Sequence, residues 1–166
     1  MTKYLLDSNI YINFYEIYYK MEFFPSFWDK IKLILNENVI FPKVVSEETH
    51  KSDEFNNWMK ENFERKILNH HEFADGWAEV LNHIDGSKFY SDISLERWSD
   101  DTIADPWIIA IAKKEGYVIV TGEISSKNLN EHKPTNKSPK IPDIAREFGV
   151  RCIGMNDFFK EVDLKI

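Results

Sequence analysis

The sequence has little cysteine and no long apolar run. Its single cysteine, Cys152, cannot form a disulfide within the chain, a pattern typical of proteins kept in reducing compartments. No run approaches the roughly 18 apolar residues of a membrane-spanning helix. The opening segment MTKYLLDSN also lacks the apolar core of a secretory signal. We therefore expect a cytoplasmic location and no membrane partner.

Basic residues are scarce relative to acidic ones. The 166-residue chain has 21 Lys and Arg against 28 Asp and Glu, for a formal net charge of -7. Proteins that hold nucleic acid through a broad basic surface use Lys and Arg to neutralise phosphates, and this composition excludes that class. Any contact with nucleic acid must be local or depend on a metal ion. Hydrophobic residues are plentiful, at 43% of the chain, which is enough for a single domain spanning residues 1–166.

Strands and helices are expected to alternate along the chain. Residues 3–7 (KYLLD) and 39–45 (VIFPKVV) predict strands followed by helical patterns, and residues 117–121 (YVIVT) predict an uninterrupted apolar strand. Residues 151–154 (RCIG) predict a short last strand. Strands without alternation are typical of parallel sheets that are covered on both faces. We expect an α/β fold with a mainly parallel sheet of four to five strands.

Four acids stand at the ends of these strands or at the starts of helices. Asp7 follows the first strand, Glu48 lies three residues after Val45, Asp105 precedes Pro106 in ADPWIIAIA, and Glu123 follows YVIVTG. In parallel α/β sheets, the carboxyl ends of the strands share one edge, where ligands bind. We expect the four carboxylates to meet there.

Each acid taken alone has a structural alternative. Asp7 and Asp105 can cap helices, Glu48 can belong to a solvated helix face, and Glu123 can be a turn residue. Together, four like charges raise one another's pKa unless a cation compensates them. An all-oxygen set of this kind suits Mg²⁺ or Mn²⁺.

The chemistry expected of such a site is phosphoester hydrolysis. Two divalent ions about 4 Å apart can activate water, orient a phosphodiester and stabilise the leaving oxygen. A haloacid-dehalogenase-like phosphatase would need an acid where this chain has Asn9. A receiver domain would need its Asp after a central strand and a Lys after a late one, and the sequence does not match that pattern. The chemistry remains that of a nuclease or another phosphatase.

Five motifs carry a resemblance to a known family. YLLDSN, VVSEE, ADPWIIAIA and VIVTGE resemble, in this order, the motifs of the PIN-domain ribonucleases, which include the toxin nucleases of bacterial toxin–antitoxin pairs. KIPDIAREFGV resembles a less studied bacterial branch of that superfamily. The resemblance extends from residue 4 to about residue 159.

The resemblance implies a PIN-like three-layer α/β/α fold and a metal-dependent endoribonuclease that leaves a 5′-phosphate on RNA. It further implies a toxin neutralised by an antitoxin protein, with Mg²⁺ or Mn²⁺ bound by Asp7, Glu48, Asp105 and Glu123. The alternative is a catalytically weak PIN-fold protein that binds nucleic acid or acts as a scaffold.

Two of these positions leave questions open. Glu123 stands where the toxin enzymes usually have Asp in a Thr-x-Asp context, and its longer side chain would shift a metal ligand. Glu47 competes with Glu48 as the ligand. The matching hydroxyl residues Ser8 and Thr121 are expected to hydrogen-bond the acids or a water on the metal.

Asp143, His70 and His71 are further residues that could bind a metal ion, and we expect none of them to do so. Asp143, in the first turn of its helix, is expected to be a surface acid that complements the helix dipole, rather than a fifth ligand. His70 and His71 are adjacent and have no third ligand at a suitable spacing, so we expect no metal site there.

Two surfaces are candidate binding sites. The segment 125–140 has one acid and four lysines that can contact RNA phosphates or form a solvated loop: Lys127, Lys133, Lys137 and Lys140. Residues 10–24 and 24–35 have more aromatic side chains than one buried face needs, which predicts an exposed apolar patch. As in similar proteins, this patch is expected to bind a second copy of the chain or an antitoxin.

Overall fold

The computed structural model describes residues 1–63, 67–126 and 138–166. The elements follow one another in the order β1 (Tyr4–Leu6), α1 (Ser8–Ile12), the π-helix η1 (Asn13–Tyr18), α2 (Pro25–Asn38), β2 (Val39–Ile40), α3 (Lys43–Glu48), α4 (Asp53–Asn62), the 3₁₀-helix η2 (His70–Phe73), α5 (Ala74–Asp85), α6 (Asp92–Trp98), α7 (Ala104–Glu115), β3 (Val118–Val120), α8 (Ile141–Glu147), β4 (Cys152–Ile153) and α9 (Met155–Glu161).

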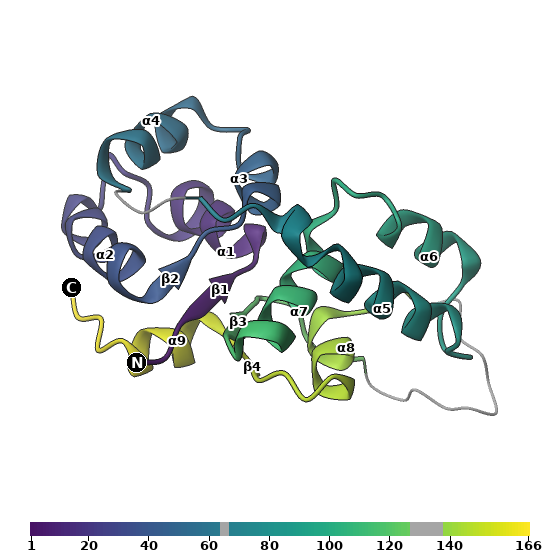
Figure 1. Cartoon of the computed structure of the whole chain (residues 1–166). Coiled ribbons are helices and arrows are strands. Elements are labelled where there is room, and N and C mark those ends of the chain that lie inside the picture. Colours follow the sequence, from purple (N-terminus) through teal and green to yellow (C-terminus); the bar gives the residue numbers. More distant parts are fainter. Residues whose placement is uncertain (64–66, 127–137) are drawn as a thin grey trace.

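The sheet has four parallel strands in the order β2-β1-β3-β4. The two central strands are buried along their whole length, as their unbroken apolar sequences predict. Figure 1 shows α1–α4 gathered on one side of the sheet and α5–α8 on the other, with the two chain termini near α9. The expected α/β fold, a parallel sheet between layers of helices, is confirmed.

Helix α7 forms the centre of the layer beside β3. It is apolar without interruption from Pro106 to Ala112, and all these residues are buried. It packs against α5, where a Cβ atom added at Gly76 would lie 3.0 Å from the Cβ of Ala110. The helix ends at Gly116, whose φ of 72° is the left-handed conformation expected of a C-cap glycine. Its other end lies at the candidate site.

Aromatic side chains fill the space between α9, η1 and α2. The rings of Tyr19 and Phe27 stack with centroids 3.9 Å apart. Phe14 packs edge-on against Phe27 and face-on against Phe159 of α9. Such pairs add to the stability gained from burial of their apolar area. These contacts pack the C-terminal helix α9 against the N-terminal third of the chain.

The second strand is shorter than predicted. The sequence 39–45 predicts a continuous strand, but β2 ends at Ile40, and Val44 and Val45 lie in helix α3. Pro42 has no N–H to extend the strand pairing, and it stands as the N-cap residue of α3. The two valines are buried in this helix. Their apolar character therefore does not distinguish a buried strand from a buried helix. In the three described ranges, no helix is long and apolar enough to cross a membrane.

Candidate functional site

A hollow of about 560 Å³ opens at the carboxyl ends of β1 and β3. All four acids expected at this edge line it: Asp7, Glu48, Asp105 and Glu123. They come from four different parts of the chain, and the parallel order of the central strands brings them together. The structure therefore supports the sequence argument that these carboxylates share one edge of the sheet.

Asp7 is buried at the base of the hollow. Its backbone N–H donates to the carbonyl oxygen of Val120 at 2.9 Å, which continues the β1–β3 pairing by one residue. Its side chain is 3% exposed, and Oδ2 accepts a hydrogen bond from Thr121 Oγ1 at 3.0 Å. Asp7 occupies the N-cap position of α1 without a side-chain capping bond, although a hydrogen bond from the backbone N–H of Ser8, the first residue of that helix, lowers its pKa.

Glu48 is the last residue of α3 and links three elements. One carboxylate oxygen accepts a hydrogen bond from Ser8 Oγ at the start of α1, and the other accepts one from the backbone N–H of Ala104 at 2.8 Å. Glu47 also lines the hollow, but its carboxylate lies 3.9 Å from Lys43 Nζ. Glu48, and not Glu47, therefore contacts the residues that stand next to Asp7 and Asp105.

Asp105 is the second residue of α7, so the structural alternative in which it caps this helix does not hold. The helix begins at Ala104 with Ile103 as its N-cap residue, so Pro106 is the third helical residue. The carboxylate of Glu48 accepts the Ala104 N–H and so performs the capping from another element. Within the described ranges, the side chain of Asp105 makes no hydrogen bond. It lines the hollow with its carboxylate available for a ligand.

Glu123 connects the hollow to helix α8. Its Oε2 accepts a hydrogen bond from the backbone N–H of Ile141, the first residue of α8, at 2.7 Å. Its own backbone N–H donates to Thr121 Oγ1 at 3.1 Å. Because Thr121 also donates to Asp7, this one hydroxyl couples two of the acids. The side chain of Glu123, which is one methylene longer than that of Asp, therefore extends to the first residue of α8.

The electrostatics of the hollow favour a bound cation. Burial, with the negative charges of Glu123 and Glu48 adding to it, raises the pKa of Asp7 to about 6. Burial, followed by repulsion from the other three acids, raises the pKa of Asp105 to about 8. Both shifts mean that the ionised carboxylates are destabilised where they stand. A divalent cation between them would offset this cost.

The donor set fits Mg²⁺ or Mn²⁺, hard ions that bind carboxylate oxygens. Asp7 and Asp105 have the carboxylates most affected by the absence of a compensating charge. In residues 1–63, 67–126 and 138–166, however, no group of three or more His, Cys, Asp and Glu side chains is arranged to hold a metal ion. The four acids surround the hollow without converging on one point.

The lysine-rich segment lies mostly outside the described residues, which exclude Lys127, Lys133 and Lys137. Lys140 directly precedes α8 and is not among the described residues that line the hollow. The predicted RNA contacts of these four lysines therefore remain predictions.

Two polar residues that do not line the hollow, Asp143 and His70, are buried. Asp143 is 1% exposed, so the expectation of a surface acid is wrong. It is buried because its carboxylate accepts hydrogen bonds from Ser126 N and from Arg146, which supply the partners that water would otherwise provide. His70 is buried as well, and its Nδ1 accepts the backbone N–H of Val44 at 3.2 Å.

Two cations that the sequence argument missed also line the hollow: Arg97, near the end of α6, and Lys51, which follows α3. The positive charge of Arg97 lowers the pKa of Asp105 and so opposes the effect of burial. Neither side chain makes an ion pair with another described residue. In the sequence, Arg97 is recognisable only as a basic residue in the last turn of a short amphipathic helix. Such residues are common on protein surfaces, so this feature did not indicate a functional site.

The fold and the hollow define an α/β protein with an acid-lined hollow at the carboxyl edge of a parallel sheet. The chain belongs to the family described as "Domain of unknown function (DUF4411)", whose model matches residues 4–166. A search of curated proteins and a search of solved structures each give no match.

Proposed function

We propose that this protein is a cytoplasmic, metal-dependent endoribonuclease that hydrolyses RNA phosphodiesters at the acid-lined hollow. The observation that carries the proposal is that four carboxylates from separate elements surround one hollow, where burial and mutual repulsion raise the pKa of Asp7 and Asp105. The motif resemblance to PIN-domain ribonucleases supports RNA as the substrate and a role as the toxin of a bacterial toxin–antitoxin pair.

We assign a role to each of the four acids and to the two hydroxyl groups bonded to them. Asp7 and Asp105 would hold Mg²⁺ or Mn²⁺, with Glu48 and Glu123 completing the acidic wall. When bound, such an ion orients a phosphodiester and offsets the charge on the leaving oxygen. Thr121 fixes the carboxylate of Asp7, and Ser8 fixes that of Glu48. These hydroxyl groups keep the acids from rotating away from the ligand.

Arg97 and Lys51 supply positive charge for the substrate in a chain whose net charge is -7. A guanidinium group binds phosphate with paired N–H donors, whereas the ammonium group of lysine acts as a point charge. We assign the more specific phosphate contact to Arg97. Lysines of the segment 125–140 would extend the contact along the RNA.

A second candidate function is a PIN-fold protein that binds nucleic acid, or acts as a scaffold, with little catalysis. The observation in its favour is that protein donors already occupy both oxygens of Glu48 and one oxygen of Glu123. Acids engaged in this way contribute less to metal binding. Among the described side chains, none are grouped to hold an ion.

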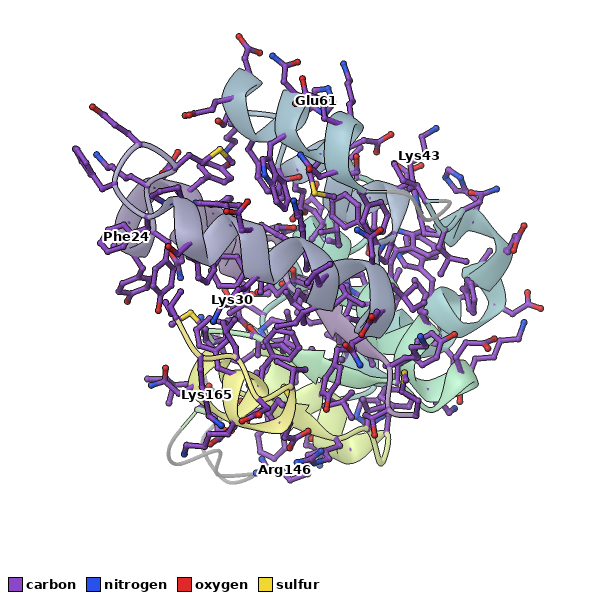
Figure 2. The ribbon with its side chains drawn as sticks, turned by 90° about the vertical axis from the view of Figure 1, so that its left-hand side faces the viewer. Phe24, Lys30, Lys43, Glu61, Arg146 and Lys165 are labelled. Atoms are coloured by element: carbon purple, nitrogen blue, oxygen red, sulfur yellow. The ribbon has the colours of Figure 1, made fainter. Side chains whose placement is uncertain are left out.

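The exposed apolar residues suggest how the protein meets a partner protein. Ile17, Tyr18, Phe23 and Phe24 are all exposed and lie on or between η1 and α2. Figure 2 shows Phe24 at the outer end of α2. We include in the proposal that this apolar surface binds a second copy of the chain or the antitoxin.

The test of the proposed function is cleavage of a mixed RNA pool by the purified protein with Mg²⁺, with Mn²⁺ and with EDTA. Asp7→Asn and Asp105→Asn should abolish metal-dependent cleavage, with folding checked by circular dichroism. Asp157→Asn is the matched control, since Asp157 pairs with Lys160 on α9, and it should retain full activity. RNA binding without cleavage by the wild type would favour the scaffold alternative. Absence of both would reject both functions.

A further inference from the structure

One buried acid lies outside the hollow. Asp143 is 1% exposed, and an ionised carboxylate at such a position is costly unless it is paired and hydrogen-bonded. Its Oδ2 accepts the backbone N–H of Ser126 at 2.9 Å, and its Oδ1 lies 3.1 Å from Arg146 Nη2. The first bond joins the segment after β3 to helix α8. Asp143 therefore connects the segment after β3 to a helix 17 residues further along the chain.

A second bond joins the same two segments in the opposite direction. Glu123 Oε2 accepts the backbone N–H of Ile141 at 2.7 Å. Each segment thus contributes one carboxylate that accepts a backbone N–H from the other. We call this pair of bonds, formed by Glu123, Ser126, Ile141 and Asp143, the carboxylate clasp. Two hydrogen bonds fix both the position and the orientation of the segment after β3 relative to α8. A single bond would let the segment rotate about it.

The need for the clasp follows from the length of the Glu123 side chain. Glutamate has one more rotatable bond than aspartate, so holding its carboxylate in one place costs more conformational entropy. Glu123 lines the hollow beside Asp7, and both contact Thr121 Oγ1. A shift of the segment after β3 would therefore disturb two of the four acids at once.

We propose that Asp143 is a positioning residue for Glu123: through the clasp it holds the Glu123 carboxylate at the hollow. This inference rests on the proposed function for its catalytic meaning. Asp143 touches neither the substrate nor an ion; it acts by fixing Ser126 against α8. Arg146, whose Nη2 lies 3.1 Å from Asp143 Oδ1, supplies the opposite charge beside this carboxylate.

The first test measures the stability of the carboxylate clasp by NMR, as the rate of hydrogen exchange at the Ile141 amide. In Asp143→Ala, the Ile141 amide should exchange at least about tenfold faster, because its acceptor on Glu123 is no longer held, and bonds to charged groups are among the stronger ones. Asp143→Asn keeps an acceptor for Ser126 N and should show a smaller effect. It also serves as the variant of choice if Asp143→Ala does not fold. Unchanged exchange at Ile141 in the variants that fold would overturn the inference.

The second test separates positioning from a purely structural role. The Mn²⁺ concentration for half-maximal cleavage should rise at least about threefold in Asp143→Ala, less than the roughly ten- to a hundredfold change that follows removal of a group bonded directly to a metal ligand. The KM for RNA should stay unchanged. Mn²⁺ should also raise the melting temperature of the variant less than that of the wild type, a readout that does not require cleavage.

Glu161→Gln provides the matched control. Glu161 accepts hydrogen bonds from Arg151 and from Tyr4 at the start of β1, at the opposite end of the strand from Asp7. This change should lower stability and leave both Ile141 exchange and the Mn²⁺ dependence as in the wild type. A similar Mn²⁺ effect in Glu161→Gln, or none in Asp143→Ala, would overturn the inference and leave the proposed function standing. A wild type without metal-dependent cleavage would instead overturn the proposed function, while the exchange of Ile141 would still report on the clasp.

Discussion

At the scale of single residues, Asp105 carries the largest electrostatic cost in the hollow. Its pKa is raised to about 8, chiefly by burial and then by the neighbouring acids. An acid whose folded-state pKa lies above its unfolded value binds a proton on folding, so stability falls as the pH rises from the unfolded value towards the folded one. Without a metal ion, the protein should therefore lose stability between about pH 4 and pH 8.

Asp105→Asn should stabilise the metal-free protein, because asparagine cannot ionise. In EDTA at pH 8, we expect its free energy of unfolding to exceed that of the wild type by at least about 1.4 kcal/mol, the equivalent of one pKa unit. Urea denaturation at pH 5 and pH 8 measures this, and the difference should be smaller at pH 5. A variant that is less stable than the wild type at pH 8 would contradict the assigned repulsion.

Arg97 is the residue to which we assign a phosphate contact. Arg97→Ala should weaken RNA binding and reduce the slope of log affinity against log salt by about one, since one phosphate contact is lost. Fluorescence anisotropy with a labelled RNA in the Asp105→Asn background measures binding without cleavage. Arg151→Ala, at a residue paired with Glu161 on α9, is the control. Equal slopes for the two variants would remove Arg97 from the RNA interface.

At the scale of elements, α7 is terminated by a glycine in a left-handed backbone conformation that L-residues rarely adopt. Gly116 has a φ of 72°, and among the described atoms nothing lies within 4 Å of an added Cβ. Gly116→Ala should therefore cost about 1 kcal/mol through backbone conformation alone. The site lies at the other end of the helix, so cleavage should be unaffected.

Gly154→Ala is the control for this prediction. Gly154 precedes α9 with a φ of -86°, which any residue adopts, and the described atoms leave space for a Cβ. Urea denaturation of both variants should show a loss for Gly116→Ala only. Equal stability of the two would mean that the left-handed cap is not needed to end α7.

The elements also show what the sequence can and cannot predict. The strand YVIVT and the Gly116 cap were predictable because their signals are local: an unbroken apolar run and a glycine that ends a helix. The start of α7 was not, because the group that caps it is Glu48, far away in the sequence. The burial of Asp143 was missed for the same reason, since its acceptor role depends on Ser126. Strand ends predicted that the four acids share an edge, whereas Arg97 stands on a helix that no motif marks.

At the scale of the whole molecule, the apolar surface beside η1 and α2 bears on assembly. Phe23 and Ile17 are 64% and 62% exposed, and such side chains close together favour association. We expect a dimer by light scattering at high protein concentration, and a monomer for Phe23→Ser. Ile93→Ser, which changes an apolar residue of α6 that is 78% exposed, should not alter assembly. A wild type that stays monomeric would argue against the dimer and leave the antitoxin as the partner of this surface.

The order of the strands has a consequence for the chain during its synthesis. Strand β1 pairs with β3, and Asp7 meets Thr121 only after residues 118–121 have been made. Glu123 finds its partner on α8 still later, at Ile141. A ribosome must therefore release most of the chain before the acids can come together. If the protein cuts RNA as proposed, the acidic site cannot be complete until residues up to Ile141 are free to fold.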